Sequence, residues 1–130
     1  MSTKTLKFVT TVLKSMNKTE KDVQTEKVTA FVEDSTIECQ QQISTLETSV
    51  LPGLRLKLKR EQNNLDKANK NYETVKYSVA HSFSAYVSNR EDALDRIDSV
   101  KNTIKQIETE ITNEEAQLAM FNTILADLTA

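Results

Sequence analysis

The second half of the sequence carries an apolar repeat that restricts the possible folds more than any other feature. Between residues 93 and 128, apolar side chains recur at alternating spacings of four and three, and Glu114 is the one interruption. The members are Ala93, Ile97, Val100, Ile104, Ile107, Ile111, Leu118, Phe121, Leu125 and Leu128. A repeat sustained over about five heptads predicts a long helix of a coiled coil or bundle. Ser88 and Glu91 have the spacing of a capping box, so we expect this helix to begin near Asn89.

Two earlier stretches show the same helical spacing. The first contains Val28, Val32, Ser35, Cys39, Ile43, Leu46 and Val50, and the second contains Leu54, Leu58, Leu65, Ala68, Tyr72, Val75, Val79 and Tyr86. The chain's one proline and one glycine, Pro52 and Gly53, lie between these stretches. A proline suits the first turn of a new helix, and a glycine eases a chain reversal. We therefore predict a turn at this point.

These features predict an all-α fold, an antiparallel bundle of three long, coiled-coil-like helices. The expected helices span residues 19–50, 53–87 and 89–128. We expect residues 1–18 to form a short amphipathic N-terminal helix or arm and residues 19–130 to form the bundle domain. The competing interpretation is an extended oligomeric coiled coil in which Pro52 only kinks a rod. Net charges of −5, +4 and −5 over residues 19–50, 51–86 and 87–130 favour helices that fold back on one another.

The residue inventory argues against an enzyme and against a metal or cofactor site. His81 is the one histidine, so paired Glu-x-x-His ligands of a di-iron site cannot be assembled. One glycine cannot build a phosphate-binding loop. Cys39 lies on an apolar stripe and is interpreted as a small core residue. Glu114 replaces an apolar core residue, and it either pairs with a basic residue of the second helix or marks fraying or a rotated seam.

The predicted reversal at Pro52 brings two groups of residues together into a candidate partner-binding tip. An apolar surface with a basic rim suits a protein partner or a second copy of the chain. The alternative is that this end is simply the best-packed part of the core. The candidate partner-binding residues are Arg55, Leu56, Lys57, Lys59, Arg60, Met120, Phe121 and Ile124.

We therefore expect a non-enzymatic structural or interaction protein, a helical coiled-coil module that binds a protein partner or forms a homo-oligomer. The alternative is a peripheral membrane protein anchored by residues 2–17. Residues 1–18 carry four lysines and no acidic residue around an amphipathic face. The acidic flanks of the basic run at residues 55–60 argue against a nucleic-acid partner. A single cysteine and the absence of a secretory apolar core predict a cytoplasmic location.

Overall fold

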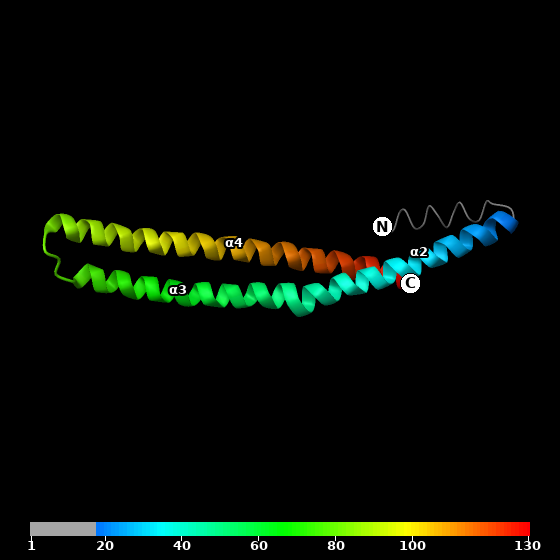
Figure 1. Ribbon diagram of the computed structural model, residues 1–130, viewed down its shortest axis with the longest axis horizontal. Helices are drawn as coiled ribbons and strands as arrows, with labels where there is room; N and C mark the ends of the chain where they lie inside the picture. Colours follow the sequence, from blue (N-terminus) through cyan, green and yellow to red (C-terminus); the bar gives the residue numbers. More distant parts are fainter. Residues whose placement is uncertain (1–17) are drawn as a thin grey trace. The chain divides into compact units, whose positions relative to one another are not determined.

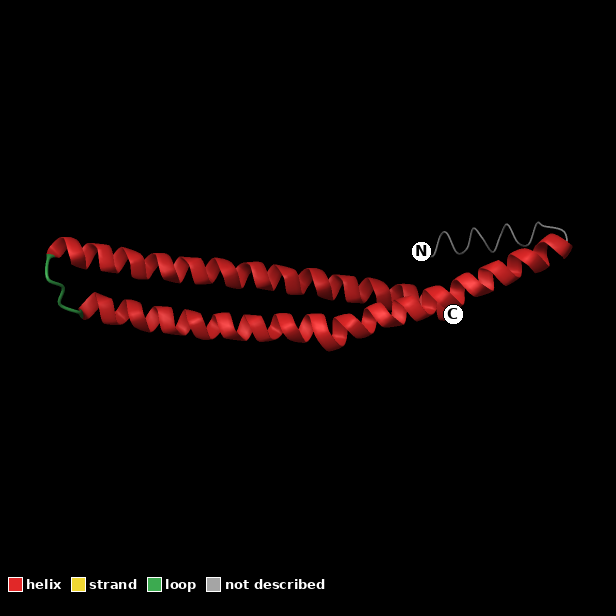
Figure 2. Ribbon diagram, viewed as in Figure 1, coloured by secondary structure: helices red, strands yellow, loops and turns green. Residues whose placement is uncertain are grey.

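The computed structural model describes residues 18–130, with side chains described from Val23 onward (Figure 1). The described elements are α2 (Lys18–Thr45), the π-helical segment η1 (Leu46–Val50), α3 (Leu51–Tyr77) and α4 (Phe83–Thr129). Because α2, η1 and α3 follow one another without a break, the chain forms two long helices, residues 23–77 and 83–129. They pack antiparallel as a hairpin (Figure 2). None of the described helices has both the length and the apolarity needed to cross a membrane.

The prediction of three helices is wrong because the chain does not reverse at Pro52. Pro52 lies in the first turn of α3, directly after η1. A proline ring inside a helix clashes with the carbonyl group four residues earlier, here that of Thr48, and cannot donate to it. The wider π-helical turn at Leu46–Val50 accommodates this residue, and kinks commonly occur at such bulges. Gly53 also adopts helical geometry, with no positive φ angle.

The reversal occurs instead at Ser78–Ser82, a segment without glycine or proline. The Ser82 hydroxyl accepts a hydrogen bond from the backbone N–H of Ala85 at 3.0 Å, and it therefore caps α4. The predicted cap at Ser88 is also wrong, because Ser88 is an exposed residue inside α4. The predicted end of the second helix at residue 87 and start of the third helix at residue 89 are therefore also wrong, because both positions lie inside α4.

The helices divide into two compact units, and the first comprises Leu51–Asn113. It contains α3 and the first part of α4, and its buried side chains form one seam. They are Leu51, Ala68, Ala93, Ile97, Val100, Ile104 and Ile107. Near the reversal, the Tyr86 hydroxyl donates to the Lys76 carbonyl oxygen at 3.2 Å. The repeat predicted from the sequence is thus confirmed as the buried stripe of α4 in this unit.

The second unit comprises the described residues up to Val50 together with Glu114–Ala130. Here α2 and η1 pack antiparallel to the last part of α4, and Cys39, Leu46 and Leu128 are buried. The burial of Cys39 confirms its interpretation as a core residue. The predicted N-terminal helix or arm, residues 1–18, lies outside the described residues apart from Lys18, which begins α2.

Candidate protein-binding groove

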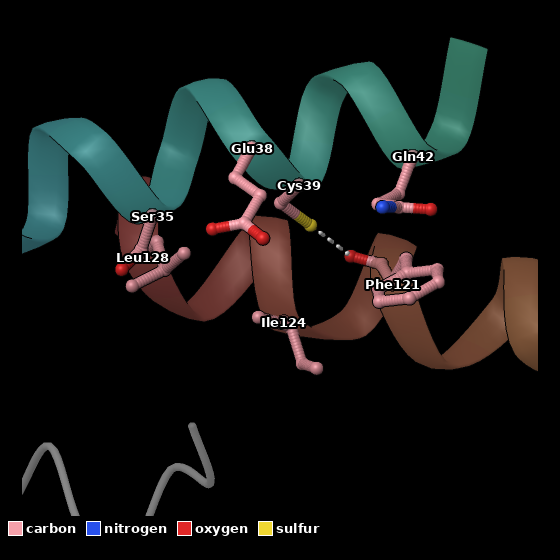
Figure 3. Close-up of a pocket in the computed structure, with 7 residues that line it drawn as sticks. All are labelled: Ser35, Glu38, Cys39, Gln42, Phe121, Ile124 and Leu128. Atoms are coloured by element: carbon pink, nitrogen blue, oxygen red, sulfur yellow. Dashed lines mark hydrogen bonds between the residues drawn. The ribbon is translucent and has the colours of Figure 1, made fainter. Parts of the chain in front are cut away.

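An open groove of about 350 Å³ runs between α2 and the last part of α4, entirely within the second unit (Figure 3). It forms because residues one and two turns apart on each helix share a face, so that a row from α2 borders a row from α4. The lining residues, called the groove below, are Ser35, Glu38, Cys39 and Gln42 from α2, and Phe121, Ile124 and Leu128 from α4. The α4 side is apolar, and the α2 side is polar except for Cys39.

Cys39 fixes the two walls of the groove to each other. Its side chain is 5% exposed, and its thiol donates a hydrogen bond to the carbonyl oxygen of Phe121 at 3.1 Å, drawn as a dashed line in Figure 3. A carbonyl oxygen has two lone pairs, so the Phe121 carbonyl can accept this bond in addition to its helical one. The thiol is therefore occupied in a packing contact between the two walls.

The surroundings of the groove are acidic. Residues 28–50 and 114–130, which form its walls and flanks, contain seven acidic and no basic side chains. Glu38 itself lines the groove and is exposed. An apolar wall combined with an acidic border is suited to an amphipathic helix that carries lysine or arginine beside its apolar face.

The predicted partner-binding residues are not brought together as a tip, because the reversal that would have joined them does not exist. Phe121 and Ile124 line the groove, and Met120 lies on the same part of α4 with 46% of its surface exposed. The remaining five belong to α3 in the other unit, and all are exposed. They are Arg55, Leu56, Lys57, Lys59 and Arg60.

Sequence reasoning missed the α2 wall of the groove. Ser35 was recognised as a member of the stripe, but Glu38 and Gln42 are polar residues on a charged helix and resemble a solvated face. Their spacing from Ser35, three and seven residues, was the available signal, since it places all three on one edge of the helix.

Glu114 occupies the seam position that the repeat left open. It is half-buried, and α4 continues through it, so local fraying is not the explanation. Among the described residues, no cluster of three histidine, cysteine or carboxylate side chains could hold a metal ion.

Comparison with known proteins adds no relative. No family model, curated protein or solved structure matches the chain. The groove must therefore be interpreted from its own chemistry.

Proposed function

We propose that this protein is a non-enzymatic interaction module whose groove binds a basic amphipathic helix of a protein partner, and that a second copy of the chain supplies this helix. The observation that carries the proposal is the apolar α4 wall, Phe121, Ile124 and Leu128, facing an acidic border. Helix-in-groove recognition uses such a wall for affinity and complementary charge for orientation.

The incomplete burial of the hairpin supports association. In a pair of helices, each helix buries one face against the other and leaves its remaining faces in water. Among the described residues, Leu51 is the most buried apolar side chain, and the seam residues Phe121, Ile111 and Leu118 keep intermediate exposure. A third helix laid in the groove would remove Phe121 and Ile124 from water.

The chain itself contains a segment with the required chemistry. Residues 1–18 carry four lysines and no acidic residue, and Leu6, Val9, Leu13 and Met16 have helical spacing. Opposite charge on this segment and on the groove favours their pairing between copies and orients it. In this arrangement the acidic groove borders of the two copies would not face each other.

The test is the absolute mass of the full chain by light scattering after size exclusion, over a tenfold concentration range. We expect a species of twice 14.7 kDa that dissociates on dilution and in high salt. Met120→Ser combined with Ile124→Ser should shift the equilibrium to the monomer. Leu56→Ser is the control, because Leu56 is 50% exposed, close to the 46% of Met120, but lies in the other unit.

Circular dichroism of each variant separates lost association from lost folding. A monomer at every concentration would contradict association between copies. Dissociation caused by Leu56→Ser, with the Met120→Ser and Ile124→Ser double variant still associated, would move the interface to α3.

A further inference from the structure

The turn that joins α3 to α4 exposes large apolar side chains without any packing role. Val79 is 101% exposed, Phe83 is 81% exposed and Tyr77 is 77% exposed, whereas the other exposed large apolar residues range from 41% to 53%. Three such residues within one seven-residue segment are a concentration rather than the scattered exposure that is normal on surfaces. Figure 2 shows this turn between the two helix ends.

The backbone on both sides of the turn is fixed by hydrogen bonds. At the end of α3, the Ser78 N–H donates to the Val75 carbonyl oxygen at 3.3 Å. At the start of α4, the Ser82 hydroxyl caps the helix at 3.0 Å from the Ala85 nitrogen. The exposed side chains are thus carried on a defined turn held between two helices.

The charged residue nearest the turn is basic. Lys76 directly precedes Tyr77, and the first acidic residues on either side are Glu73 on α3 and Glu91 and Asp92 on α4, next to Arg90. Lys76 and Arg90 lie within 5.4 Å and 5.9 Å of the rings of Tyr77 and Tyr72. A positive charge beside exposed apolar side chains attracts a surface that bears negative charge.

We propose that the Tyr77–Phe83 turn docks on a phospholipid bilayer that contains anionic lipid. Val79 and Phe83 enter the interfacial region, and Tyr77 lies at the headgroup level, where tyrosine is enriched. Lys76, directly before Tyr77, faces the lipid phosphates. This inference goes beyond the proposed protein-binding function and depends on different residues.

The size of the surface favours a bilayer over a protein partner. A standard protein interface takes about 20 to 30 residues from each side, and a single helix-to-helix turn with three large apolar side chains supplies far fewer. Shallow insertion into a lipid interface needs only a small apolar group next to positive charge. The turn's polar backbone also agrees with docking at the interface, because hydrocarbon does not accept unpaired peptide groups.

The experiment is cosedimentation of the full chain with vesicles made of equal parts of phosphatidylcholine and phosphatidylserine. We expect the wild-type chain to bind, and Val79→Ser combined with Phe83→Ser to lower the partition coefficient by about tenfold or more. The matched control is Ile37→Ser combined with Leu56→Ser, which removes two exposed apolar side chains from α2 and α3. This control should bind as the wild type does.

A second readout reports insertion directly. The chain contains no tryptophan, so Val79→Trp introduces a single tryptophan at the turn, which can be excited apart from the tyrosines. Its emission should shift to shorter wavelengths with these vesicles and should be quenched by brominated lipid. A fluorophore that stays in water during binding would overturn the proposal.

Three further outcomes would also overturn it. The first is absence of wild-type binding, and the second is equal binding by the turn variant. The third is a loss of binding in a chain that starts at Thr19, combined with normal binding of the turn variant. Residues 2–17 would then be the membrane anchor. Circular dichroism should show the turn variant folded, since the replaced side chains contact no core. A lowered solution mass for that variant would identify the turn as a protein contact instead.

Discussion

The thiol of Cys39 and the carbonyl oxygen of Phe121 lie 3.1 Å apart, joining residues that are 82 positions apart in the sequence. This contact sets the antiparallel register of α2 against the last part of α4. Moving two turns along each helix from it places Leu46, the first residue of the π-helical segment, level with Glu114. The polar interruption of the apolar repeat therefore lies opposite the point where the other helix leaves α-helical geometry.

Burial of Cys39 predicts slow modification of its thiol. The side chain is 5% exposed, and a reagent can reach the sulfur only when α2 and α4 separate locally. We expect the native chain to react with a disulfide reagent at least about tenfold more slowly than the chain in denaturant. Cys39 is the sole cysteine, so the absorbance change reports this site alone. Equal rates in the two conditions would show that the walls of the groove are not joined.

The sequence was sufficient to predict the all-α fold class and the buried seam, because apolar residues at heptad spacing lie on the helix face that is buried on folding. Ala93, Ile97 and Ile104 were assigned to the seam and are buried. The position of the reversal was not predictable in the same way. Pro52 and Gly53 are local turn signals, but a proline is tolerated where the preceding turn widens, and Leu46–Val50 carries no distinctive sequence mark for a π-helix.

The candidate site was predictable only on one of its walls. Phe121 and Ile124 were identified because the end of α4 has more apolar residues than one seam requires. Their pairing with Leu56 failed, since it depended on the reversal at Pro52. Glu38 and Gln42 were missed because, in the sequence, polar residues that border a groove have the same spacing as polar residues on an ordinary solvent-exposed face.

The cap of α4 provides a test that distinguishes the two possible helix starts. The Ser82 hydroxyl satisfies the N–H of Ala85, so Ser82→Ala should lower the free energy of unfolding by about 1 kcal/mol. Ser88→Ala is the control, because Ser88 lies exposed within α4, where alanine favours the helix. Chemical denaturation of both variants measures the difference. A larger loss for Ser88→Ala would restore the predicted start near Asn89.

Gly53 should be replaceable with a gain in stability. It lies in a helix without a positive φ angle, and a Cβ atom built there meets nothing within 4 Å. Gly53→Ala should therefore raise the free energy of unfolding by about 0.5–1 kcal/mol, through the higher helix propensity of alanine. Urea titration followed by circular dichroism gives this value. If Gly53 were the hinge of a chain reversal in a left-handed conformation, the same substitution would be destabilising.

The seam of the first unit should carry most of its stability, and Ile104 is one of its buried members. Ile104→Ala removes three methyl or methylene groups from a packed contact, so the free energy of unfolding should fall by about 2–4 kcal/mol. Ile37→Ala makes the same chemical change on a residue that is half exposed on α2, and its loss should stay below about 1 kcal/mol. Urea titration of the two variants measures both losses on one scale. Equal losses would mean that Ile37 is buried in solution, which would place a second copy or another segment of the chain on that face of α2.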